Sequence, residues 1–164
     1  MRVRAGPALL LGLALMLAAC GSGSEQPAAD DRMRKPLQSI SDSAEFDRIL
    51  AAAGDRLLIF DFFADWCRPC KELEPVLESI AAQHQSVTDI YRIAFDDNQT
   101  LAELFGVRGI PFVAFVKNRT LVYSLMGLRP KEAYLEAIAS FTRPGAAAAE
   151  TGSGVRLDSG VTDK

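Results

Sequence analysis

The sequence lacks the features that mark several common classes of protein. Only three of its 164 residues are cysteine, too few for a small secreted domain held together by disulfides. It has no dense run of Lys and Arg, and its formal charge of −3 makes nucleic acid a poor candidate as a partner. Its 49% hydrophobic and 24% charged residues are typical of a soluble globular protein and argue against wholesale disorder or several membrane spans. The length predicts one ordinary domain with at most a small appendage.

The N-terminal residues have the pattern of a secretory signal peptide. Arg2 and Arg4 precede an apolar run over residues 8–19, which is short for a bilayer core of roughly 30 Å. The run ends in Leu-Ala-Ala before Cys20 and resembles the lipobox of bacterial lipoproteins, in which the signal is cut before a cysteine that is then acylated. The alternative is an ordinary signal peptide with a chance cysteine. We expect residues 1–19 to be removed and lipid on Cys20 to anchor the exported protein to a bacterial membrane, facing the periplasm or the cell exterior.

Segments of low complexity flank a periodic core. Residues 20–36 consist mostly of Gly, Ser, Ala, Pro and charged residues, which is typical of a flexible linker. Residues 143–164 include four consecutive alanines followed by Gly, Ser and Asp, and we expect a disordered tail there. Hydrophobic periodicity is confined to residues 37–142, which we interpret as the folded domain.

Within this domain the spacing of apolar residues predicts interleaved helices and strands. Helices are predicted at about 42–54, 67–83, 101–105 and from 130 onward. Strands are predicted at about 57–63, 91–95, 112–117 and 121–126. Pro75 should kink the second helix, and Asn118 and Arg119 should form the tight turn between the last two strands. The order predicts an α/β fold with a central mixed sheet between helices.

The stretch Trp66-Cys67-Arg68-Pro69-Cys70 lies where the first strand meets the second helix. Two cysteines separated by two residues at a helix start can close a small disulfide ring, and the unpaired amides there favour a thiolate. We therefore expect Cys67 to be an exposed nucleophile with a lowered pKa, aided by the charge of Arg68. Cys70, one turn deeper, would then attack the mixed disulfide, and Pro69 would stiffen the loop.

Two other interpretations of the cysteine pair are weaker. Zinc normally takes four ligands, and with Cys20 acylated only Cys67, Cys70 and His84 remain as soft or imidazole ligands, so we expect no metal. An inert disulfide would close so short a loop that it would bring almost no stability.

The segment 37–142 resembles the thioredoxin family over nearly its whole length. The matching residues are Asp61-Phe62-Phe63-Ala64-Asp65-Trp66-Cys67-Arg68-Pro69-Cys70-Lys71, then Pro75, Val107-Arg108-Gly109-Ile110-Pro111 and Gly127. The resemblance implies the thioredoxin fold and an activity that needs no cofactor. It also implies that Pro111 is cis and faces the cysteines, and that the backbone of Ile110 pairs with an extended client segment.

The same resemblance implies that Asp61 is a buried carboxylate that exchanges protons with the resolving cysteine, Cys70. A lone acid in an apolar strand is expected on physical grounds to have a raised pKa, although a local hydrogen bond is an alternative. Arg92 stands where thioredoxins often have a lysine, and it cannot serve as a proton donor. Arg68 replaces a usual glycine. Trp66 should pack beside the cysteines and shape the docking surface, with ordinary core packing as the alternative.

These features predict a thiol:disulfide oxidoreductase that reduces protein disulfides outside the cytoplasm. Its expected partners are protein disulfide and thiol clients, a membrane electron-relay protein, and the membrane itself through the lipid. An oxidase or isomerase is an alternative, because Arg68 could stabilise the thiolate. A second alternative is a tethered binding or holdase module that turns over no disulfide.

Overall fold

A computed structural model of the chain describes residues 37–143 and 155–157. Its helices are α1 (Ser43–Ala52), α2 (Arg68–His84), α3 (Gln99–Leu104) and α4 (Lys131–Thr142). Its strands are β1 (Gln38–Ile40), β2 (Leu57–Phe63), β3 (Thr88–Ala94), β4 (Phe112–Lys117), β5 (Thr120–Met126) and β6 (Val155–Arg156). The expected signal peptide, Cys20 and the linker lie outside the described residues.

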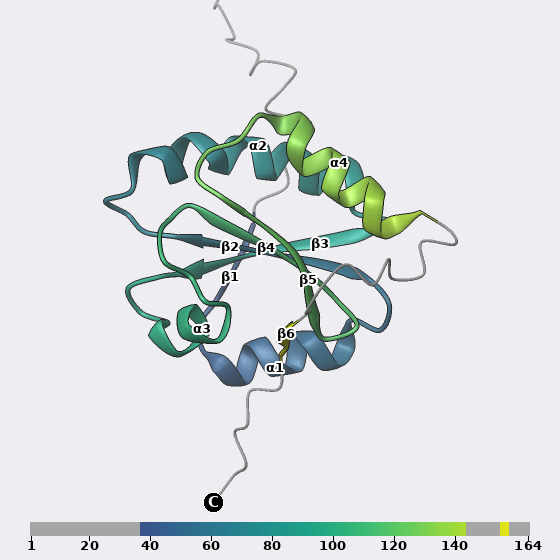
Figure 1. Cartoon of the computed structure of the whole chain (residues 1–164), viewed down its shortest axis with the longest axis horizontal. Helices are drawn as coiled ribbons and strands as arrows, with labels where there is room; N and C mark the ends of the chain where they lie inside the picture. The colour runs from purple at the N-terminus through teal and green to yellow at the C-terminus, as the bar shows by residue number, and fades with distance from the viewer. Residues whose placement is uncertain (1–36, 144–154, 158–164) are drawn as a thin grey trace, which may run out of the picture.

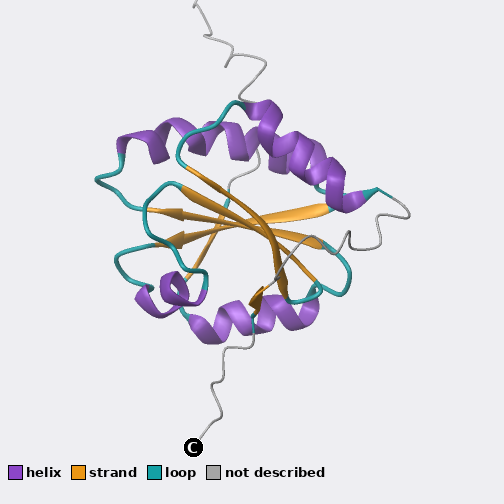
Figure 2. Ribbon diagram, viewed as in Figure 1, coloured by secondary structure: helices purple, strands orange, loops and turns teal. Residues whose placement is uncertain are grey.

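The strands form one mixed sheet in the order β1-β3-β2-β4-β5-β6, with helices on both faces. β1, β3 and β2 run parallel, and β4, β5 and β6 each pair antiparallel with the strand before them in this order. Figures 1 and 2 show α1 and α3 on one face of the sheet and α2 and α4 on the other. This is the thioredoxin fold that the sequence predicts. None of the helices in the described part of the chain is both long and apolar enough to cross a membrane.

Strand β2 lies inside the sheet and sends alternate side chains into two cores. Leu58, Phe60 and Phe62 join the apolar cluster beneath α1 and α3. Leu57 and Ile59 join the cluster on the side of α2 and α4. Because successive strand residues point to opposite faces, Asp61 faces α2 and α4 as well. The strand pattern therefore directs a carboxyl group toward the helix that follows the strand in the chain.

Helix α1 begins as the sequence predicts. The Asp42 carboxylate accepts a hydrogen bond from the Glu45 backbone N–H at 2.8 Å. The Glu45 carboxylate in turn accepts from the N–H of Ser41, also at 2.8 Å, one residue earlier than in the usual capping box. Gly54, with φ of 57°, follows the helix end. α2 runs through Pro75, so the proline does not end that helix.

The structure differs from the predicted strands at one edge of the sheet and confirms the hairpin turn. β1 was not predicted, because three residues with two exposed side chains are too short to show a period. β3 begins at Thr88, three residues earlier than expected, where its buried hydroxyl donates to the Leu57 carbonyl at 2.7 Å. Asn118 and Arg119 both have positive φ, as a tight hairpin turn requires.

The expectation of a disordered tail over 143–164 is wrong for residues 155–157. β6 pairs antiparallel with the edge of β5. Leu157 is fully buried in the cluster beneath α1 and α3, and its N–H donates to the Arg119 carbonyl at 2.9 Å. So short a segment carries no periodicity, and only its partner strand identifies it as structured. It covers an otherwise open sheet edge with backbone hydrogen bonds and one leucine.

We expect Leu157→Ala to lower the free energy of unfolding by about 2 kcal/mol, the low end of the range for a buried leucine, because the segment can detach instead of enclosing a cavity. Val155→Ala, at an exposed position of the same segment, is the control and should change stability by no more than about 0.5 kcal/mol. Urea unfolding followed by circular dichroism measures both. Equal losses in the two variants would contradict the packing of Leu157 in the core.

Candidate active site

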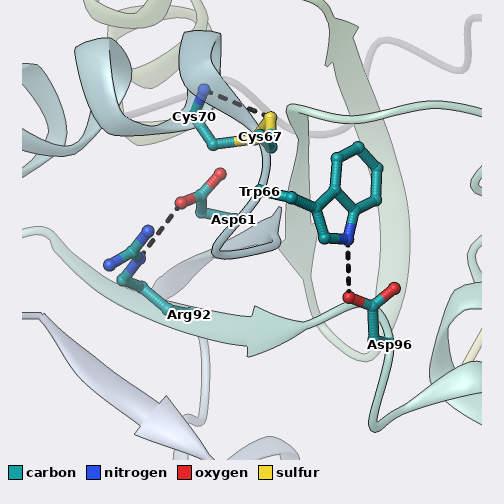
Figure 3. The surroundings of a disulfide bond; sticks show 6 residues. All are labelled: Asp61, Trp66, Cys67, Cys70, Arg92 and Asp96. Atoms are coloured by element: carbon teal, nitrogen blue, oxygen red, sulfur yellow. Dashed lines mark hydrogen bonds and ion pairs between the residues drawn. A yellow bond between two sulfur atoms is a disulfide. The ribbon is translucent and has the colours of Figure 1, made fainter.

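The cysteine pair lies at the junction of β2 and α2, as predicted. Cys67 caps the N-terminus of α2 with an extended backbone, and its sulfur accepts a hydrogen bond from the Cys70 N–H at 3.3 Å. The two residues are joined by a disulfide, with their Cα atoms 5.3 Å apart. Pro69 occupies the first turn, where a missing N–H leaves no intrahelical bond unmade. Figure 3 shows the pair above Asp61 at the start of the helix. A sulfur in this position faces the positive end of the helix dipole.

The expectation that Cys67 is exposed is wrong for the disulfide state. Cys67 is 3% exposed and Cys70 is 1% exposed. Both pack with Ala64 in a small apolar cluster, against which Phe63 and Ile110 also lie. These apolar neighbours come from β2, from the turn after it and from the loop before β4, so the sequence spacing of the cysteines could not reveal this cover.

The loop before β4 brings the predicted proline to the site. The Ile110–Pro111 peptide bond is cis, as the resemblance implied. The Pro111 carbonyl accepts from the Gly127 N–H at 2.8 Å, which ties this loop to the end of β5. Ile110 packs against the cysteine cluster, so the residue expected to pair with a client lies beside the reactive sulfurs.

Asp61 is wholly buried at the centre of the sheet, beneath the cysteines. Its Oδ2 accepts a hydrogen bond from Arg92 Nε at 3.3 Å, while its Oδ1 has no hydrogen-bond partner among the described residues. Figure 3 shows that Oδ1 is on the side of the disulfide. Burial raises the pKa of Asp61 from 3.8 to about 7, and the charge and hydrogen bond of Arg92 oppose that rise. The expected raised pKa is thus present, and the carboxyl can change protonation near neutral pH.

Arg92 lies opposite Asp61 in the register of β2 and β3 and has two further partners. Its Nη1 donates to the Glu74 carboxylate at 2.7 Å, and its guanidinium lies over the Phe63 ring, 3.7 Å from the centroid. The sequence interpretation placed Arg92 near Asp61 but missed Glu74. Glu74 follows Cys70 by four residues on α2, one turn further along the same face, and this spacing was the available signal.

Two exposed side chains of the motif, Trp66 and Arg68, have partners of their own. Trp66 is 69% exposed, which rules out the core-packing alternative, and its Nε1–H donates to the Asp96 carboxylate at 2.8 Å. This bond, drawn in Figure 3, holds the indole beside the cysteines. The Arg68 side chain is 90% exposed, and its Nε lies 3.3 Å from the Glu72 carboxylate. Sequence reasoning did not find Asp96, which is 30 residues from Trp66.

The structure separates the residues of the alternative zinc site. His84 is the last residue of α2 and Cys70 lies in its first turn, so at 1.5 Å per residue they are about 20 Å apart along the helix. Within the described part of the chain, no three His, Cys, Asp or Glu side chains are grouped so that they could hold a metal ion. One zinc ion therefore cannot bind Cys67, Cys70 and His84 together.

Comparison with known proteins agrees with the fold. The Thioredoxin family profile matches residues 38–140. Thioredoxin of Chlamydia pneumoniae is 40% identical over 96 residues, which span 58% of this chain and 90% of that protein. Thioredoxin of Haemophilus influenzae is 36% identical over 88 residues, which span 54% of this chain and 81% of that protein.

Solved structures show the same likeness. A mutant thioredoxin of Halobacterium salinarum has a TM-score of 0.60 and 33% identity, covering 66% of this chain and 92% of that one. The thioredoxin of Malassezia sympodialis has a TM-score of 0.61 and 28% identity, covering 67% and 95%. The fold, the cysteine pair and these relatives define a thiol:disulfide oxidoreductase of the thioredoxin type. The chain belongs to the thioredoxin family.

Proposed function

We propose that the protein reduces disulfides in protein clients through a mixed disulfide on Cys67. The Cys67 thiolate attacks one client sulfur and forms a new S–S bond, and the other client sulfur leaves and takes a proton. The Cys70 thiol loses its proton and attacks the Cys67 sulfur, which closes the Cys67–Cys70 disulfide and releases the second client sulfur. The client gains two electrons and two protons. A separate donor of two electrons and two protons then restores the dithiol.

The hydrogen bond from the Cys70 N–H to the Cys67 sulfur is the observation that carries this proposal. At a helix N-terminus that bond becomes charge-assisted when the sulfur is a thiolate, so it favours Cys67 as the attacking group. Asp61 would accept the proton of Cys70, since its pKa of about 7 suits proton exchange near neutrality. The partnerless Oδ1 on the disulfide side is the oxygen available for that transfer, directly or through one water.

Reduction is favoured over oxidation by the surroundings of the pair. The oxidase alternative relied on Arg68 stabilising the thiolate, and this side chain is 90% exposed and already paired with Glu72. Solvent therefore screens most of its effect on Cys67. Asp61 acts in the opposite sense, because a buried negative charge below the pair disfavours a thiolate. A less stable thiolate makes the dithiol a better reductant.

The client would approach across Trp66, Ile110 and Pro111. Trp66 offers a large exposed indole fixed by Asp96, and the Ile110–Pro111 segment lies beside the sulfurs. The backbone at Ile110 would pair with an extended client segment next to its disulfide. A binding or holdase module would use the same surface without turning over a disulfide. Replacement of the cysteines therefore distinguishes the two functions.

We expect Cys70→Ser to accumulate a covalent client complex, because the second attack cannot occur and Cys67 remains joined to the client. The purified variant, incubated with insulin or a cell extract, should give adducts on non-reducing gels that dithiothreitol releases. Cys67→Ser/Cys70→Ser is the control and should form none. It should also lose insulin reduction in the presence of dithiothreitol, whereas a holdase would keep its clients and its effect in this double variant.

We also propose that the protein is exported and anchored through lipid on Cys20. The support is the sequence Leu-Ala-Ala-Cys after a charged and then apolar N-terminal segment. Removal of the signal peptide would take away Arg2 and Arg4, two of the 18 basic residues, and would leave all 21 acidic residues. Anionic lipids would therefore attract the mature chain only weakly. The lipid on Cys20 would carry the attachment. A reductant outside the cytoplasm would need a membrane electron-relay protein to supply its electrons.

We expect Cys20→Ala to abolish the incorporation of labelled palmitate when the full-length chain is expressed in a bacterial host. The variant should also leave the membrane fraction or retain its uncleaved N-terminal segment. Cys67→Ser is the matched control, which removes a thiol but should keep the label and the membrane association. Failure of the parent chain to incorporate label would refute the anchor and leave the redox proposal in place.

A further inference from the structure

Three charged side chains from three different elements form a chain below the disulfide. Asp61 on β2 is wholly buried, and the Arg92 side chain on β3 is 10% exposed. Arg92 Nε lies 3.3 Å from Asp61, and its Nη1 lies 2.7 Å from Glu74 on α2. The Glu74 side chain is 39% exposed, so its carboxylate reaches water while holding the guanidinium from the other side. Arg92 is thus shared between a buried and a solvated carboxylate.

Sharing matters because an arginine keeps its charge under all ordinary conditions. If Asp61 were the only carboxylate partner, each protonation of Asp61 would leave a nearly buried guanidinium without a counter-charge, and such a state is strongly unfavourable. That penalty would hold Asp61 in its charged form and make it a poor acceptor of protons. A lysine in place of Arg92 could yield its proton instead, so the need for a second acid arises from the arginine.

We propose that Glu74 is a positioning residue for disulfide exchange: it neutralises Arg92 so that Asp61 can take up and release the proton of Cys70 without leaving the guanidinium unpaired. The inference rests on the proposed function for the destination of that proton. The sharing of Arg92 between the two carboxylates is independent of the proposed function and follows from the geometry of the three side chains. Of the two carboxylate contacts of Arg92, the one to Glu74 is the shorter. This agrees with Glu74 as the main counter-charge of Arg92.

Within residues 37–143 and 155–157, the other groups packed around Asp61 carry no competing charge. From α4, Tyr134 is buried, its hydroxyl accepts from the Arg129 N–H at 3.3 Å, and burial raises its pKa, so it stays neutral near pH 7. Lys131 of α4 is directed to the Ser79 hydroxyl, 2.9 Å away and further along α2. The neighbour of Asp61 on β4 is Val113, which is apolar. Arg92 and Glu74 are therefore the charged side chains that control Asp61.

Removal of the Glu74 charge has two effects on Asp61, and both have the same sign. Glu74 disfavours a second nearby carboxylate, so Glu74→Gln removes a contribution that raises the pKa of Asp61. The freed Arg92 can also turn both of its donors to Asp61, which stabilises the carboxylate further. The pKa of Asp61 should fall, and a larger share of Asp61 should be locked in the charged form at pH 6–7.

The test is the titration of the Asp61 carboxyl by carbon-detected NMR in the oxidised full-length protein. Glu74→Gln should move its midpoint down by about one pH unit, the scale of one gained charge-assisted hydrogen bond. Glu72→Gln is the matched control, since Glu72 is on the same helix and has its own arginine partner, Arg68, on the solvent side. In Glu72→Gln the Asp61 midpoint should remain that of the parent protein.

Kinetics give a second readout that a purely structural role would not move. The pH profile of client release from the Cys67 mixed disulfide should shift in the same direction in Glu74→Gln, because Asp61 remains a carboxylate to lower pH. An unchanged or raised Asp61 midpoint in Glu74→Gln would overturn the proposal, as would an equal fall in Glu72→Gln. The titration needs no activity, so its failure is distinct from a failure of the protein to reduce disulfides.

Discussion

The hydrogen bond between the Cys70 N–H and the Cys67 sulfur is the interaction on which the site depends. It exists because a short turn joins the buried strand β2 to the helix that follows, so that Cys67 becomes the cap of α2. The same start of the helix places Cys70 one turn inside, within reach of a disulfide. A single junction thereby places the two sulfurs in the positions that we propose for the attacking and the resolving group.

The second constraint is the burial of charge directly beneath that junction. The position of Asp61 on β2 is the result of strand alternation, which sends its side chain to the face covered by α2 and α4. Its burial raises its pKa to about 7, which suits the proton exchange with Cys70 that we propose. Arg92 contacts both Asp61 and the partly exposed Glu74. The core therefore holds a titratable carboxyl without an unpaired guanidinium.

Local features could be predicted from the sequence, and contacts between distant segments could not. The cap at Asp42, the helix start at Cys67 and the buried acid at Asp61 follow from patterns within a few residues. The cis bond before Pro111 followed from the family resemblance. The cover over Cys67, the Trp66–Asp96 bond and the burial of Leu157 depend on segments that meet only in the folded chain. They carry no periodic signal, so the structure was needed to find them.

The reduction potential of the Cys67/Cys70 couple tests the account most directly, because it sums the effects of the helix start, the buried carboxyl and the screened Arg68. Equilibration of the purified protein with glutathione or dithiothreitol buffers of known potential, followed by gel shift after alkylation, would measure it. We expect a value near the roughly −270 mV of thioredoxin. A value near the roughly −120 mV of strong disulfide oxidants would contradict it.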